Sequence, residues 1–358
     1  MRTIFFLLLA IVTSRSVAYA QTDSAALPKT NMDSLLAQYK QELADFELKH
    51  GHWVQTPNVN MHYLTWGKRS GMPLIWSHGT FGNAYEVYGV ADSLVAAGYY
   101  LIAIDFYGHG LTAIPGKEVS LYHVADDIKA LMDELKIKKA VIGGFSRGGS
   151  ITTAFYDSYP NRVRALVLED GGSVAWDVNG HKKSTEEMAN EFINNYKMRT
   201  PAPVYNTELE AFTRLYNNNG QKADFTRIAF TFFNRLKQNN EGKWEMNPGV
   251  DDLVCEHTAE QLITAVHRPY AANNMFGAST HLIYPKMIYR NLDVPMLIFD
   301  PVSDEDWFDF EEENTQLQQS HPDLIVHKVY ENTGHAVKME HPQEFVRDMA
   351  EFLKTVKN

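Results

Sequence analysis

The stretch that decides the fold runs from residue 140 to residue 155 and reads AVIGGFSRGGSITTAF. Its first residues are apolar and predict a buried strand. The residues after Gly148 can form a helix that continues to Tyr159, where Pro160 ends it. Between them stands G-x-S-x-G, with Ser146 at its centre. This order predicts a sharp, strained turn that requires glycine neighbours and presents the Ser146 hydroxyl at the start of a helix.

Ser146 is a candidate nucleophile, but a serine hydroxyl needs a base, and the base needs an acid to orient it. Two later segments supply candidates. Asp304 follows the predicted strand 294–299, and His335 follows the predicted strand 324–330 in the sequence Asn332-Thr333-Gly334-His335. We therefore predict Ser146 as the nucleophile, His335 as the general base and Asp304 as the acid.

Five stretches together, in the same order along the chain, resemble the α/β-hydrolase superfamily over residues 50–357. Besides G-x-S-x-G they are His78–Gly82, Asp105–Gly110 (D-x-x-G-x-G), Val294–Pro295 with Asp304, and Gly334–His335 with Glu340–Pro342 and Phe345. The order Ser, Asp, His is the one that this superfamily uses. A single G-x-S-x-G is a weak signal, whereas five matching stretches are specific.

The resemblance also implies further site residues. The oxyanion hole would be formed by the backbone N–H groups of Thr80 and Arg147, with Phe81 as the alternative to Thr80. His78 and His109 would shape loops rather than take part in catalysis. The acid stays open to three alternatives, which are Asp300, Asp306 and, after the sixth strand, Asp170. The Arg147 side chain either reaches the surface, pairs with an acid or contacts a substrate carboxylate.

Strands and helices alternate along most of the chain, which predicts an α/β fold with a doubly wound, mainly parallel sheet. The predicted strands are 53–55, 61–65, 73–76, 100–104, 140–144, 165–168, 296–299 and 325–330. Residues 171–288 break the alternation with helical stretches at 185–196, 208–217 and 223–237. We predict a core of residues 50–170 and 289–358, a helical cap of residues 171–288 inserted after the sixth strand, and a lead-in with a helix at 21–49.

The first twenty residues have the pattern of a cleavable signal peptide. A short basic start precedes the apolar run Ile4–Val12, and Ala18-Tyr19-Ala20 fits an A-x-A cleavage site. The apolar run is too short to span a bilayer comfortably. We expect a secreted or periplasmic protein whose mature chain begins at Gln21 and that has no stable membrane insertion.

The composition and charge of the chain limit the kinds of binding partner that we expect. The net charge is −11, which gives no support to binding of nucleic acid or an anionic membrane. The single cysteine excludes an intramolecular disulfide. His50 and His52 have no third ligand in sequence, and no G-x-G-x-x-G or P-loop motif occurs, so we expect no metal and no cofactor. The oligomeric state stays open.

The resemblance implies an exported serine hydrolase that cleaves a small or medium carboxylic ester through an acyl-enzyme. Alternatives on the same fold are a lactonase, a C–C bond hydrolase, a perhydrolase and an aminopeptidase. A non-catalytic ligand-binding protein on the same scaffold is an alternative of another class.

Overall fold

The computed structural model describes residues 31–176, 184–198, 203–218, 229–303 and 310–356. Its centre is an eight-stranded sheet with the strand order β1-β2-β4-β3-β5-β6-β9-β10. The strands are β1 (Gly51–Gln55), β2 (Asn60–Trp66), β3 (Met72–Ser77), β4 (Tyr99–Ile104), β5 (Ala140–Phe145), β6 (Val163–Glu169), β9 (Met296–Val302) and β10 (Ile325–Glu331). Pairing is antiparallel for β1 with β2 and for β2 with β4, and parallel for the other neighbours.

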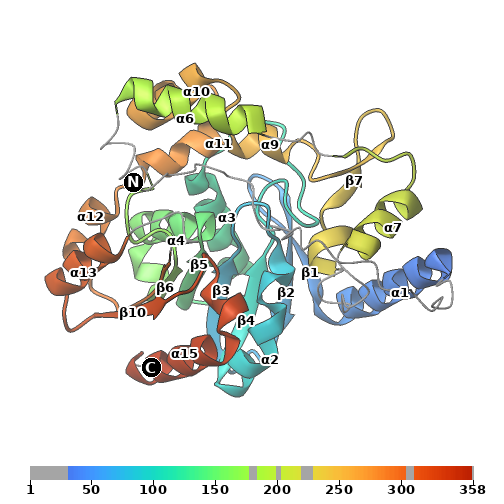
Figure 1. Ribbon diagram of the computed structural model, residues 1–358. Coiled ribbons are helices and arrows are strands. Elements are labelled where there is room, and N and C mark those ends of the chain that lie inside the picture. The colour runs from blue at the N-terminus through green and yellow to red at the C-terminus, as the bar shows by residue number, and fades with distance from the viewer. Residues whose placement is uncertain (1–30, 177–183, 199–202, 219–228, 304–309, 357–358) are drawn as a thin grey trace.

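Helices cover both faces of this sheet, as Figure 1 shows. One face packs on α3 (Leu121–Glu134) and α4 (Arg147–Ser158), and the other on α2 (Tyr88–Ala96) and α15 (Pro342–Thr355). Every residue of β4 and β5 is buried. Strands covered on both faces read as continuous apolar runs, which is why the sequence pattern locates them. The predicted strands all lie within observed strands, and the fold class is confirmed.

The chain between β6 and β9 is called the inserted segment here (residues 171–288), and the part of it that the structure describes is mostly helical. Figure 1 shows α6, α9, α10 and α11 of this segment at one end of the sheet. Its helices are α6 (Thr185–Met198), α7 (Glu208–Asn218), α9 (Val250–Val254), α10 (Ala259–His267), α11 (Met275–Ala278) and α12 (Pro285–Ile288). The limits of the predicted cap domain stay a prediction.

The helix predicted at 223–237 is only partly present in its described part, because the chain is helical over Ala229–Phe233 and extended from Leu236 on. A π-helical turn occupies Ala229–Phe233, and β7 (Leu236–Gln238) then pairs with β8 (Trp244–Met246). The connection turns at Asn239, whose side chain accepts hydrogen bonds from two backbone N–H groups, and at Gly242, whose φ is 74°. This turn chemistry favours a hairpin over a helix.

The predicted N-terminal helix is present as α1 (Met32–His50), capped by the Asn31 side chain. Figure 1 shows it beside α7 of the inserted segment. Leu36 and Tyr39 pack in a cluster with Phe212 and Phe232, and Lys40 forms a 2.8 Å ion pair with Glu208. The helix therefore contacts the inserted segment as well as the core.

Two further elements complete the C-terminal part. Helix α13 (Glu311–Ser320) lies between β9 and β10, and the short helix α14 (Val337–Glu340) follows the loop that carries His335. Within the described ranges, no helix combines the length and apolar composition that crossing a membrane requires. The predicted signal peptide lies outside the described residues.

Candidate active site

Ser146 stands at the turn between β5 and α4 in a conformation that few non-glycine residues adopt. Its φ is 54° and its ψ is −119°. The turn is so tight that a β-carbon at Gly144 would lie 2.2 Å from the Gly148 carbonyl oxygen, and one at Gly148 would lie 2.0 Å from the Ser77 carbonyl oxygen. Both positions therefore require glycine. The strands on either side of β5, which are β3 and β6, hold the turn in its strained conformation.

Two neighbouring strands, β5 and β6, end at the same level next to this turn, and the next strand, β9, continues past that level to Val302. The register pairs Phe145 of β5 with Glu169 of β6, and Glu169 with Phe299 of β9. The next residues along the three strands are Ser146, Asp170 and Asp300. Parallel strands place the residues at their carboxyl ends along one edge of the sheet, so these polar side chains gather where α/β folds bind ligands.

His335 joins this group through Asp170. Its Nδ1 hydrogen-bonds to Oδ2 of Asp170. Its ring also packs against the ring of Phe145, with the centroids 4.6 Å apart. The Ser146 backbone lies against Gly171, where a β-carbon would be 2.3 Å from the Ser146 carbonyl oxygen. The nucleophile candidate and the base candidate therefore both adjoin the Asp170–Gly171 corner.

The structure favours Asp170 as the acid, one of the alternatives that the sequence left open. An imidazole Nδ1 has room for one partner, and Asp170 occupies it. Asp300 is engaged elsewhere, because its Oδ2 lies 2.6 Å from Nε2 of His327 on β10. The predicted acid Asp304 and its alternative Asp306 lie outside the described residues.

Asp170 is almost fully buried and has a φ of 43°. Burial raises the pKa of its carboxyl group well above the usual range, and the negative charges of Asp300 and Glu169 raise it further. A desolvated carboxylate attracts a proton on a neighbouring imidazole more strongly than a hydrated one does. The Asp170–His335 hydrogen bond is therefore suited to stabilise an imidazolium.

The loop after β3 carries the predicted oxyanion donor Thr80. The Phe81 N–H donates to Nε2 of His109 at 3.1 Å, and the Gly79 N–H donates to Glu86 at 3.0 Å. The N–H of Phe81, the alternative donor, is thus already engaged. Among the described residues, the Thr80 N–H and the Arg147 N–H have no protein acceptor. Both remain candidates for the oxyanion hole.

His78 and His109 hold this loop in shape, as the resemblance implied. His78 stacks on Phe106 with the ring centroids 3.9 Å apart, and its Nδ1 lies 2.7 Å from the Gly79 carbonyl oxygen. His109 bonds to the Tyr107 carbonyl oxygen through Nδ1, which leaves Nε2 to accept from Phe81. Burial lowers the pKa of His109 well below its ordinary value, so the ring is neutral.

The Arg147 side chain neither reaches the surface nor pairs with a carboxylate within the described chain. It is 5% exposed. Its Nε donates to Thr80 Oγ1 at 2.9 Å, Nη1 donates to Thr280 Oγ1 at 3.1 Å and Nη2 donates to the Val254 carbonyl oxygen at 3.3 Å. Burial lowers the pKa of the guanidinium, which still stays charged at neutral pH.

Sequence reasoning missed a buried ion cluster behind these groups. The Lys338 ammonium is 3.0 Å from Glu86 and 2.9 Å from Glu169, and it lies 3.6 Å from the centre of the Phe145 ring. Glu86 in turn accepts the Gly79 N–H. The cluster links the loop of His335, the end of β6, the oxyanion loop and the serine turn. Lysine and glutamate are normally exposed, so no sequence signal marks these three residues as buried.

A second buried ion network was also missed, and it lies under the D-x-x-G-x-G turn. His62 is fully buried and lies 2.7 Å from Asp105 and 3.0 Å from Glu47 of α1. Burial alone lowers the pKa of His62, but the hydrogen bonds and charges of Asp105 and Glu47 outweigh it and raise the pKa to about 9. His62 is therefore protonated in the folded protein at neutral pH.

This network makes stability depend on pH. Because the folded pKa of His62 exceeds the unfolded value, its contribution is complete below about pH 6.5 and is lost as the pH rises to about 9. We expect the free energy of unfolding to fall by up to about 3 kcal/mol over this interval. Urea titrations at several pH values measure it. His62→Gln, which cannot be protonated, should show a much flatter dependence, and equal slopes in both proteins would contradict the assignment.

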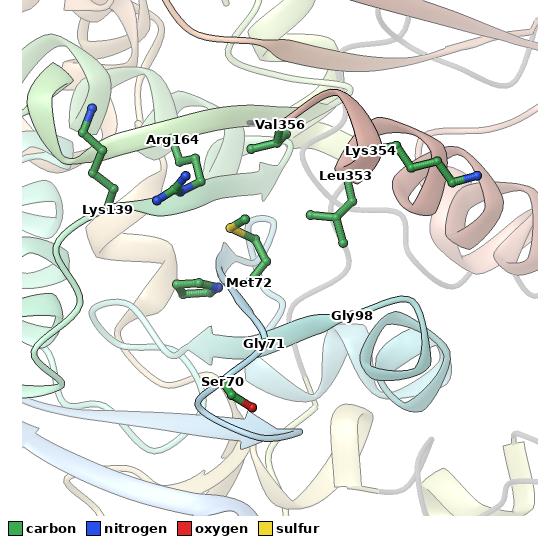
Figure 2. Close-up of a pocket in the computed structure, with 10 residues that line it drawn as sticks. Ser70, Gly71, Met72, Gly98, Lys139, Arg164, Leu353, Lys354 and Val356 are labelled. Atoms are coloured by element: carbon green, nitrogen blue, oxygen red, sulfur yellow. The ribbon is translucent and has the colours of Figure 1, made fainter. Parts of the chain in front are cut away.

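A cavity of about 550 Å³, whose lining residues Figure 2 shows, lies at the end of the sheet opposite to Ser146. It is lined by residues at the amino ends of strands, among them Gly71, Gly98 and Arg164. It therefore does not belong to the candidate active site. The described residues contain no cluster of three His, Cys, Asp or Glu side chains placed to hold a metal ion.

Comparison with known proteins identifies the family. The sequence profile of the alpha/beta hydrolase fold matches residues 73–342. The chain belongs to the alpha/beta hydrolase fold family. This α/β-hydrolase is 27% identical over 260 residues to a putative 2-succinyl-6-hydroxy-2,4-cyclohexadiene-1-carboxylate synthase of Bacillus subtilis, which covers 72% of this chain and 81% of that one. It is 24% identical over 310 residues to a serine hydrolase-like protein of Dictyostelium discoideum, covering 82% and 79% of the two chains.

Solved structures agree on the fold. The α/β-hydrolase aligns with an E-2-(acetamidomethylene)succinate hydrolase at a TM-score of 0.60 and 17% identity, over 85% of this chain and 98% of that one. It aligns with a carboxylesterase from Bacillus subtilis at a TM-score of 0.53 and 17% identity, over 90% and 98% of the two chains.

Proposed function

We propose that the protein is a serine hydrolase that cleaves a small or medium carboxylic ester. The observation that carries the proposal is the convergence of the strained Ser146 turn with the hydrogen-bonded Asp170–His335 pair at one edge of the sheet. Among the named relatives and structures, the Dictyostelium protein is serine hydrolase-like and the two solved structures are hydrolases, which supports the reaction class, whereas the Bacillus relative is a putative synthase, so no substrate is identified.

The proposed reaction has two halves. Ser146 Oγ attacks the ester carbonyl carbon while His335 Nε2 takes the hydroxyl proton, and the carbonyl oxygen becomes an oxyanion that the N–H groups of Thr80 and Arg147 stabilise. The intermediate collapses, and His335 passes the proton to the departing alcohol. Water then attacks the acyl-enzyme with the same base, which releases the acid and restores Ser146. Asp170 holds the imidazole and stabilises its charged form.

Labelling with a fluorophosphonate probe tests the proposal directly. We expect the native protein to be labelled at Ser146, identified by peptide mass spectrometry, and to hydrolyse p-nitrophenyl esters. A panel that adds lactones and aminoacyl amides then identifies the bond that the enzyme prefers. A folded protein that neither labels nor turns over any of these compounds would favour a non-catalytic binding role.

We also propose export with cleavage before Gln21, because the first twenty residues combine a basic start, an apolar run and an A-x-A site. N-terminal sequencing of the protein recovered outside the cytoplasm should begin at Gln21. Replacing Ala18 and Ala20 by bulky residues should retain the leader. An intact Met1 in the membrane fraction of cells that express the native chain would show that the segment is a retained anchor.

A further inference from the structure

The Arg147 side chain connects two parts of the candidate site that are far apart in sequence. It leaves the first residue of α4, next to Ser146, and reaches the Thr80 hydroxyl in the oxyanion loop. Its other two hydrogen bonds go to Thr280 and Val254, both in the inserted segment. One guanidinium therefore bridges the loop and the inserted segment.

The bridge is strong because the charge is buried. A guanidinium removed from water must keep its N–H groups bonded, and its three acceptors here are neutral oxygens. Hydrogen bonds from a charged donor are stronger than hydrogen bonds between neutral groups. The planar fork of arginine also fixes the directions in which the bonds point, which a flexible lysine ammonium does not.

The bridge adds a contact at Thr80 to a loop that is also held on either side of this residue. On either side of Thr80 the backbone is already fixed, since Glu86 holds the Gly79 N–H and His109 holds the Phe81 N–H. The Thr80 side chain is held by Arg147. Thr80 and Arg147 are also the two residues whose backbone N–H groups form the proposed oxyanion hole. The side chain of Arg147, one donor residue, thus holds Thr80, the other donor residue.

We propose that the Arg147 side chain is a positioning residue that sets the Thr80 N–H in the oxyanion hole and makes this setting depend on the docked inserted segment. This inference rests on the proposed function. Two of the three bonds that orient the guanidinium come from the inserted segment, so displacement of that segment releases the guanidinium and, with it, Thr80. Stabilisation of the transition state is thereby coupled to the contacts that Thr280 and Val254 of the inserted segment make with Arg147.

Paired variants test the bridge. Thr80→Val keeps the backbone N–H and the side-chain shape but removes the acceptor, whereas Thr80→Ser retains a hydroxyl. Loss of an oxyanion donor costs about 10² to 10³ in kcat, so we expect a misplaced donor in Thr80→Val to cost about 10- to 100-fold in kcat. KM should stay within about twofold of the native value, since only the transition state is affected. Thr80→Ser should restore most of kcat.

The second pair tests the coupling to the inserted segment. The Thr280 side chain donates no hydrogen bond to the loop itself, so Thr280→Val acts on Thr80 only through Arg147. We expect a smaller loss in kcat than for Thr80→Val, about 3- to 10-fold, with KM again nearly constant and with recovery in Thr280→Ser. Circular dichroism and thermal unfolding of each variant establish that it folds. If Thr80→Val does not fold, the Thr280 pair decides by the same criteria.

The outcomes separate this proposal from the proposed function. If the native protein neither labels at Ser146 nor hydrolyses esters, the proposed function fails. If the native protein is active and Thr80→Val keeps native kcat, the positioning role of Arg147 is overturned. A valine effect confined to KM, or a serine variant as impaired in kcat as the valine variant, would also overturn it. A native kcat in Thr280→Val would overturn the coupling to the inserted segment.

Discussion

Ser146→Ala should lower kcat for an activated ester by about 10⁴ to 10⁶ while the protein stays folded. The substitution removes the only atom that forms the acyl bond in the proposed reaction, and no other group replaces it. Alanine retains a β-carbon, so the turn keeps the same backbone strain as in the native protein. Initial rates on a p-nitrophenyl ester measure the effect.

Thermal unfolding of the Ser146→Ala protein provides the control, and its midpoint should stay close to the native one. The same variant should lose fluorophosphonate labelling altogether. Native turnover by the purified variant, with contaminating esterases excluded, would show that Ser146 is not the nucleophile.

Asp170→Asn should lower kcat by up to about 10⁴. The amide has the shape of the carboxylate but lacks the charge that stabilises the imidazolium, and its NH2 group can donate to Nδ1 and so favour the wrong tautomer of the imidazole. Asp170 Oδ2 is the partner of His335 Nδ1, so the loss follows directly from the geometry. Steady-state rates on an activated ester provide the measurement.

Asp300→Asn is the matched control for Asp170→Asn, because Asp300 lies at the same level of the sheet, directly after the Phe299 that pairs with Glu169, but its side chain bonds to His327. Its kcat should stay near the native value even if its unfolding midpoint falls. Asp304→Asn is the second control and should also be nearly normal. A crippled Asp304→Asn together with a nearly normal Asp170→Asn would return the acid to the loop after β9.

The strands of the core could be predicted well because strands buried on both faces are apolar throughout, as β4 and β5 are. The serine turn was predictable for a related reason, since only glycine fits at positions 144 and 148. The hairpin of β7 and β8 was not, because its two short strands carry no clear period-2 pattern and the turn residues alone identify it.

The site was only partly predictable because its sequence signals differ in kind. Ser146 and His335 lie in short sequence motifs that indicate their local structure and their role. The acid candidates Asp170, Asp300 and Asp304 all follow strands, and the sequence does not say which carboxylate meets which histidine. That choice depends on pairing across strands, here Asp170 with His335 and Asp300 with His327. The burial of Lys338 likewise follows from three-dimensional packing alone.

The positions of Asp170 directly after β6 and of Asp300 at the same level of β9 have a consequence for how such an enzyme changes over evolutionary time. The two aspartates lie near the carboxyl ends of neighbouring strands, and each already has a histidine partner. The scaffold therefore does not dictate which strand donates the acid, and a descendant could transfer that duty by altering loops alone. The same choice is open in protein engineering. A carboxylate placed after either strand lies at the same edge of the sheet, so the sheet backbone need not change.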